Sequence, residues 1–167
     1  STPHGTTFTH EGRHHSVTDS PALPKPVQSR VPIIVGGGGP KRTPRLAATY
    51  ASEFNLPFQS IERFTEQCDR VRSACDAIGR DPESMVYSAA LVMCVGADEK
   101  EIARRAAAIG REVDELRANG LCGTPAEAAE RLAQWREAGA RRIYLQVLDL
   151  TDLDHLDAVA EGVMPLV

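Results

Sequence analysis

The chain has 167 residues, of which 42% are hydrophobic and 25% charged, and a formal net charge of -4. This composition predicts a soluble globular domain with a core of its own and excludes a fibre, a disordered tail or a small disulfide-stapled protein. Basic residues are scattered, no apolar run approaches the roughly 18 residues that span a bilayer, and residues 1–15 are polar, so we expect no nucleic-acid partner, no membrane partner and a cytoplasmic location.

Residues 1–30 are expected to form an irregular, partly extended lead-in, because they are rich in Thr, His, Ser and Pro and lack sustained periodicity. Within them, residues 10–14 read His-Glu-Gly-Arg-His and satisfy the H-E-x-x-H pattern of zinc-protease helices. Gly12 inside the motif and the threonine-rich residues before it favour an extended chain over a helix. We therefore expect a surface loop and no metal site.

Residues 31–167 are expected to form one α/β domain. Its first element is the apolar run 31–35, which stops at four glycines as a strand buried on both faces would. Thr43 and Pro44 then predict the start of a helix, with the threonine as the cap and the proline at the first helical position.

Strands and helices alternate along the rest of the chain. Further strands are predicted over 52–55, 85–95 and 142–147, and helices over 61–78, from the capping box at Asp98 and Glu101 to about residue 118, over 124–138 and from about residue 152. Four strand–helix units imply a parallel sheet with right-handed crossovers. Because a whole (β/α)8 barrel needs about 250 residues, the pattern fits half of such a barrel or an open doubly wound sheet.

The sharpest candidate site is the glycine-rich turn over 36–43, between the first strand and its helix. Successive glycines let backbone N–H groups point into one concavity, and the helix start adds further unpaired N–H groups. This pattern predicts a phosphate site, to which Lys41, Arg42 and the Thr43 hydroxyl can add hydrogen bonds. The alternative is a flexible loop whose glycines only make a turn.

Other candidates carry weaker signals. We expect His155 on a solvated face of the last helix, which would bury Leu153 and Leu156, and Trp135 in the core or an interface. Gln146 and Asp149 follow the last strand, where barrel enzymes keep functional groups. The alternative is that they are ordinary polar residues that end a strand.

The four cysteines, Cys68, Cys75, Cys94 and Cys122, form no C-x-x-C pair and no metal-ligand spacing. We expect reduced thiols that serve as small core residues. Cys68 and Cys75 share a helix face but lie about 10 Å apart along its axis, beyond disulfide reach.

Three stretches, 24–28, 32–43 and 46–51, together resemble the luciferase-like monooxygenase family, most closely its branch that depends on the deazaflavin coenzyme F420. Residues 53–55, 79–82, 123–125 and Pro165 match the same family in the same order. The resemblance therefore covers about Phe8 to Val167, and residues 8–17 resemble the family's insertion segment.

The resemblance implies a TIM barrel of which this chain supplies the C-terminal half, strands five to eight. It also implies that the glycine-rich turn binds the cofactor phosphate, through Gly36, Gly37, Gly38 and Gly39 and through Lys41 and Thr43. The implied cofactor is coenzyme F420, with FMN as the alternative, and the implied activity is an oxidoreductase or monooxygenase reaction on a small organic substrate.

No segment resembles the family's first four strands, so the catalytic residues stay unassigned and the chain alone is expected to be an inactive fragment. Half a barrel leaves sheet edges unpaired, so we expect a homo-oligomer or association with a missing N-terminal half. The alternatives are a stand-alone phosphate- or nucleotide-binding α/β module and a non-catalytic half-barrel partner.

Overall fold

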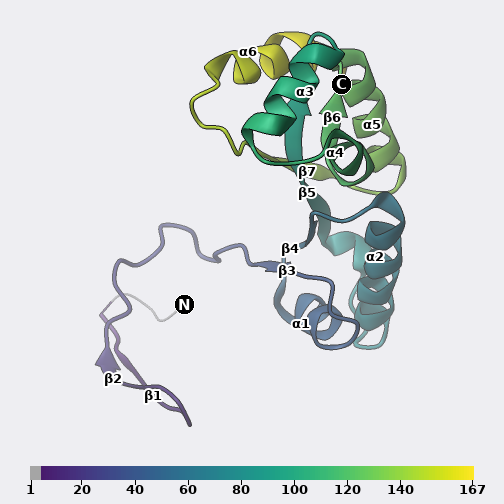
Figure 1. The fold of residues 1–167 in the computed structure, drawn as a ribbon. Coiled ribbons are helices and arrows are strands. Elements are labelled where there is room, and N and C mark those ends of the chain that lie inside the picture. The colour runs from purple at the N-terminus through teal and green to yellow at the C-terminus, as the bar shows by residue number, and fades with distance from the viewer. Residues whose placement is uncertain (1–4) are drawn as a thin grey trace. The chain divides into compact units, whose positions relative to one another are not determined.

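The computed structural model describes residues 5–167, and the chain divides into two compact units at the Pro32–Ile33 junction (Figure 1). The first unit contains an antiparallel hairpin of β1 (Phe8–Glu11) and β2 (Ser16–Ser20). The expected irregular lead-in is therefore wrong for these residues. Every residue of the two strands except Ser20 is exposed, so the hairpin has no buried face to create an alternating pattern.

The H-E-x-x-H segment spans the end of β1 and the first residues of the hairpin turn. His10 lies opposite Val17 in the ladder, and the Gly12 N–H donates to the His15 carbonyl at 2.9 Å. The prediction of an extended chain is confirmed, and the histidines of the motif do not share a helical face as a zinc-protease site would require.

The second unit is a parallel sheet of β3 (Ile34–Gly36), β4 (Glu53–Pro57), β5 (Val86–Val95), β6 (Leu121–Gly123) and β7 (Arg142–Gln146). The strand order is β3-β4-β5-β6, and β7 also pairs with β5. This arrangement confirms the α/β fold with parallel βα units. The strand β6 was not predicted, because three residues are too few to show a period.

Six helices connect and cover the strands: α1 (Arg42–Tyr50), α2 (Ile61–Asp76), α3 (Glu99–Ala108), α4 (Val113–Asn119), α5 (Pro125–Glu137) and α6 (Leu153–Gly162). Short 3-10 turns lie at Pro82–Ser84 and Met164–Leu166. Among residues 5–167, no helix is long and apolar enough to cross a bilayer.

Capping residues in the sequence predicted some helix ends correctly. The predicted capping box at Thr124 and Glu127 is confirmed, with side chain and backbone bonded in both directions. The single helix expected from Asp98 to about residue 118 is wrong, because the chain breaks into α3 and α4 around Gly110, whose φ is +65°. Such a backbone conformation ends a helix, and glycine adopts it without strain.

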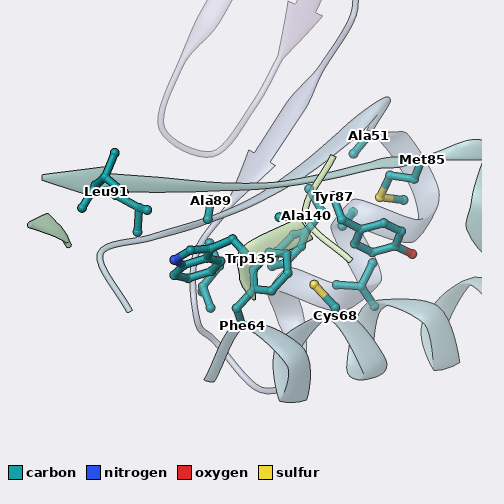
Figure 2. Packing of buried hydrophobic residues seen from close by; sticks show 14 of the residues in the cluster. Ala51, Phe64, Cys68, Met85, Tyr87, Ala89, Leu91, Trp135 and Ala140 are labelled. Carbon is teal, nitrogen blue, oxygen red and sulfur yellow. The ribbon is translucent and has the colours of Figure 1, made fainter. Parts of the chain in front are cut away.

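The sheet has a large core on the face covered by α1, α2, α5 and α6. Alternate residues of β5, such as Ala89 and Leu91, point into this core, where Phe64 and Trp135 meet edge to face with ring centroids 5.3 Å apart (Figure 2). Trp135 is thus a core residue, one of the two expected roles. A smaller second core lies on the opposite face of the end of β5, under α3 and α4.

Candidate functional site

The glycine-rich bend lies at the carboxyl end of β3, at the edge of a parallel sheet. The Gly37 N–H donates to the Asn55 carbonyl of β4 at 3.2 Å, which prolongs the pairing of β3 with β4 by one residue. Gly37 has a φ of +123°, a conformation that strains any L side chain. The bend therefore requires glycine at this position.

A buried side chain of α2 holds the bend in place. Gln67 is 2% exposed, and its Nε2 donates to the Gly39 carbonyl at 2.8 Å and to the Gly37 carbonyl at 3.4 Å. Sequence reasoning missed Gln67. The available signal was a polar residue on the apolar face of a predicted helix, between Phe64 and Val71.

Two amides of the bend have no hydrogen-bond partner in the described part of the chain, unlike the carbonyls that Gln67 bonds. Within residues 5–167, no protein acceptor receives the N–H groups of Gly38 and Gly39. Gly38 is exposed and Gly39 half-buried, so these donors are open to solvent. They can bind an oxygen-rich anion without breaking any protein hydrogen bond.

The start of α1 lies directly after the bend and is uncapped. Lys41 occupies the N-cap position without a side-chain capping bond, so the predicted cap at Thr43 is wrong. Thr43 instead lies in the first turn, where its Oγ1 would be 3.0 Å from a Cβ placed on Gly39. Its hydroxyl therefore faces the bend.

The charge around the bend favours an anion. Lys41 and Arg42 are exposed, and the first turn of α1 holds no acidic residue. Free amides, the positive end of a helix dipole and two cations form a suitable environment for a phosphate group. The residues fit a phosphate-bearing cofactor, and none of them is an acid or base suited to catalysis.

The face of the sheet opposite the large core carries a second polar group. Glu53 is 4% exposed; its carboxylate accepts a hydrogen bond from the Tyr144 hydroxyl at 2.9 Å and forms an ion pair with Arg142. On the same face, the Asn55 Nδ2 donates to the Ser88 Oγ at 2.9 Å. Sequence reasoning missed these contacts because the partners lie on different strands.

A third polar group closes the carboxyl end of β5. The Val95 N–H donates to the His155 Nε2 at 2.9 Å, and the Val95 carbonyl accepts from Arg105 at 2.5 Å. Arg105 is 3% exposed and pairs with Asp152, with 3.0 Å between Nε and Oδ2. Hydrogen bonding to Arg105 lowers the pKa of Asp152 to about 2.

The prediction for the last helix is therefore wrong. His155 is 4% exposed rather than solvated, whereas Leu153 and Leu156 are 65% and 45% exposed. Val159 shares the buried face with His155. Burial and the nearby Arg105 charge lower the pKa of His155, which keeps its Nε2 available as an acceptor.

Neither Gln146 nor Asp149, the two polar candidates at the end of the last strand, takes part in the bend. Gln146 is exposed on β7, and the Asp149 Oδ1 accepts hydrogen bonds from the Thr151 N–H and hydroxyl at 3.0 and 2.7 Å. Asp149 thus has the role of a turn-forming residue.

Comparison with known proteins identifies relatives of the chain. Residues 3–115 match the sequence model of a family described as luciferase-like monooxygenase. No functionally curated protein matches the sequence.

Solved structures share the fold over nearly the whole chain. An F420-dependent secondary alcohol dehydrogenase solved with an F420-acetone adduct aligns with a TM-score of 0.79 and 17% identity, over 97% of this chain and 56% of that one. The coenzyme F420 dependent tetrahydromethanopterin reductase of Methanopyrus kandleri aligns with a TM-score of 0.76 and 13% identity, over 97% and 58%. The oxygenating constituent of 3,6-diketocamphane monooxygenase from Pseudomonas putida, in complex with FMN, aligns with a TM-score of 0.64 and 15% identity, over 96% and 58%.

These neighbours are TIM-barrel proteins, and the chain spans little more than half of the length of each. The fold is therefore four βα units of a (β/α)8 barrel, rather than an open doubly wound sheet.

Proposed function

Because the chain belongs to the luciferase-like monooxygenase family, we propose that it supplies the cofactor-phosphate-binding half of a flavin- or deazaflavin-dependent oxidoreductase. The cofactor is coenzyme F420, or alternatively FMN, and when bound it supplies hydride chemistry on a small organic substrate. The observation that carries the proposal is the open amide pair of Gly38 and Gly39 at an uncapped helix start.

The binding role is assigned to Gly36, Gly37, Gly38 and Gly39, with Lys41 and Thr43 beside them. The Gly38 and Gly39 amides and the Thr43 hydroxyl would donate to phosphate oxygens, Gly36 and Gly37 would set the bend that presents them, and the exposed Lys41 would add a positive charge. Gln67 positions the bend through its carbonyls and does not itself contact the phosphate.

The chain spans about half of its structural neighbours, so the reaction of a whole enzyme needs further contacts. We propose that these come from an N-terminal half or from another copy of this chain. A stand-alone phosphate-binding module and a non-catalytic half-barrel partner remain the alternative functions. Size measurement by light scattering, with and without cofactor, separates a monomeric module from the assembled forms.

Titration of the chain with coenzyme F420, FMN and inorganic phosphate tests the binding role. We expect saturable binding of one cofactor, detected by the change in its fluorescence, and a higher melting temperature because a ligand of the native state raises stability. Inorganic phosphate should compete at high concentration. A chain that binds neither cofactor while phosphate still raises its melting temperature supports the stand-alone module instead.

Substitution of Gly38 by Ala tests the bend without straining it. A Cβ at Gly38 would meet only the Leu56 Cδ1, at 3.8 Å, so the fold should tolerate the methyl group. The methyl group would crowd an anion at the adjacent amides, so we expect cofactor affinity to fall by about tenfold, or about 1.4 kcal/mol. The matched control is Gly79→Ser, in an open turn after α2, although its φ of +70° will cost some stability. Unchanged affinity in the Gly38 variant contradicts the assignment.

The charge contribution is tested by Lys41→Gln against Lys100→Gln. Both lysines are exposed near the start of a helix, in α1 and α3, but only Lys41 adjoins the bend. We expect Lys41→Gln to weaken cofactor binding about threefold, more at low than at high salt, and Lys100→Gln to leave it unchanged. Equal effects of the two changes would show only a general charge effect.

A further inference from the structure

The small core beneath α3 and α4 contains two cysteines that face each other across neighbouring strands. Cys94 of β5 and Cys122 of β6 are direct partners in the parallel ladder. Both side chains belong to this core, where Cys94 is fully buried and Cys122 is 8% exposed. Both are free thiols.

Their spacing suits a covalent bond. Adjacent strands lie about 4.8 Å apart, and cysteines are bridged when their Cα atoms are about 4.4–6.8 Å apart. As direct ladder partners, Cys94 and Cys122 project on the same face of the sheet into the same small core, where the Cys94 Sγ also donates to the Ile102 carbonyl at 3.6 Å. No backbone rearrangement on the scale of a strand is needed to join them.

The local chemistry also favours reaction at this pair. Interaction with the neighbouring Cys122 thiol, together with the positive charge of Arg105, lowers the pKa of the Cys94 thiol, while the same pairing and burial raise the pKa of Cys122. The thiolate is the reactive form of cysteine, so a lowered pKa increases the reactive fraction.

The other two cysteines provide an internal contrast. Cys68 and Cys75 lie on the same helix, α2, about 10 Å apart along its axis, which is beyond disulfide reach. Burial raises the pKa of Cys68 to about 12, which suppresses its thiolate. The same chain thus carries one thiol pair placed to react and one that is not.

We propose that Cys94 and Cys122 form a reversible disulfide that joins β6 to β5 when the chain meets a peroxide. Two S–H bonds and one O–O bond break, one S–S bond forms, and hydrogen peroxide is reduced to two water molecules by the two electrons that the thiols lose. Thiol–disulfide exchange with a dithiol reductant restores both S–H groups. The bond closes a loop over residues 95–121, which holds α3 and α4.

Peptide mapping of the 167-residue chain tests the pair directly. Trypsin cleavage after Lys and Arg leaves the cysteines on four separate peptides, residues 64–70, 73–80, 81–100 and 118–131. The folded chain is treated with hydrogen peroxide, its remaining thiols are alkylated in denaturant, and the digest is analysed without reductant. Sulfoxide at Met164, which is 59% exposed, shows that the peroxide dose was effective.

We expect peptides 81–100 and 118–131 to appear joined, with the loss of two hydrogen atoms, in most chains, and to separate after dithiothreitol. The Cys122→Ala variant should abolish this product, whereas the matched Cys75→Ala variant should keep it. The proposal is overturned if Met164 is oxidised while Cys94 and Cys122 stay reduced or carry only sulfinic acid. It is equally overturned if peptides 64–70 and 73–80 join to the same extent, because that requires unfolded chain.

Discussion

The ends of β3 and β5 differ in how their backbone N–H and carbonyl groups are hydrogen-bonded. Both strands end at the carboxyl edge of one parallel sheet and leave backbone groups without a ladder partner. At the end of β5, the N–H and carbonyl of Val95 are both bonded to side chains, His155 and Arg105. At the end of β3, Gln67 satisfies only carbonyls, and the amides of Gly38 and Gly39 stay open.

The difference separates a structural strand end, at β5, from the strand end to which we assign ligand binding, at β3. A buried backbone group must find a partner, and the side chains of α3 and α6 supply it at β5. Donors left free beside a helix start, with the local carbonyls already bonded, are available to an external acceptor. The comparison predicts that substitutions at the β5 end affect stability, whereas substitutions at the bend mainly affect ligand binding.

The largest effect on stability is expected from Asp152→Ala at the carboxyl end of β5, which we call the closed end because side chains bond both backbone groups of Val95. Removing this carboxylate leaves the buried Arg105 with only the partly exposed Glu101 as a charged partner, at 3.0 Å. We expect the free energy of unfolding to fall by about 3 kcal/mol. Urea unfolding checks this value, with Asp154→Ala as the control, an exposed acid in the first turn of the same helix. A similar loss in both variants would mean that Arg105 does not depend on Asp152.

A smaller effect is expected from Gln67→Leu at the bend. The variant removes the donor to the Gly37 and Gly39 carbonyls from a buried position, so we expect a loss of about 1–2 kcal/mol of stability. Cofactor affinity should fall further than stability implies, because the amides lose their fixed direction. The control is Gln134→Leu, an exposed glutamine of α5. Retained affinity in the Gln67 variant would show that the bend holds its shape without this side chain.

The smallest effect concerns pH at the closed end. Burial lowers the pKa of His155 in the folded chain, so below pH 6.5 the unfolded chain binds more protons than the folded one. The stability contributed by neutral His155 is thus fully present above pH 6.5 and is lost progressively as pH falls through the lowered pKa.

Unfolding in urea at pH 7.5 and 5.5 measures this dependence. His155→Gln keeps an acceptor for the Val95 N–H without a titrating ring, so we expect a flatter pH profile. His14→Gln, in the exposed hairpin turn, should keep the profile of the parent chain. A parent profile that is already flat over this interval would rule out the proposed role of His155.

The sequence was sufficient for the α/β class, for most of the strands and helices of the second unit and for the position of the bend, but not for β6, the hairpin or the break between α3 and α4. Apolar runs such as 31–35 and 85–95 and the capping box at Thr124 depend on neighbours in sequence, so they could be recognised. The partners at the closed end could not, because Val95 and His155 are 60 residues apart. The leucines of α6 suggested a different buried face, and only the packing on β5 decides between the two.

At the bend, the sequence indicated an anion site from its glycines and cations, but it did not indicate the side chain that holds the bend in place. Gln67 lies 28 residues after Gly39, and its contact requires α2 to pack against the end of β3. Thr43 was read as a cap because it precedes Pro44, although the helix starts two residues before Pro44, at Arg42, and its N-cap is Lys41. Helix boundaries carry this uncertainty whenever more than one residue can fill the cap.

The central strand β5 sets the order in which the chain can fold during synthesis. It needs β4 on one edge and β7 on the other, and β7 is supplied only by residues 142–146. A nascent chain that ends before these residues leaves Ser88–Val92 of β5 without its β7 partner, so the sheet can close only after residue 146 has been made. Amide hydrogens of Ser88–Ala90, flanked by strands on both edges, should therefore exchange most slowly with solvent.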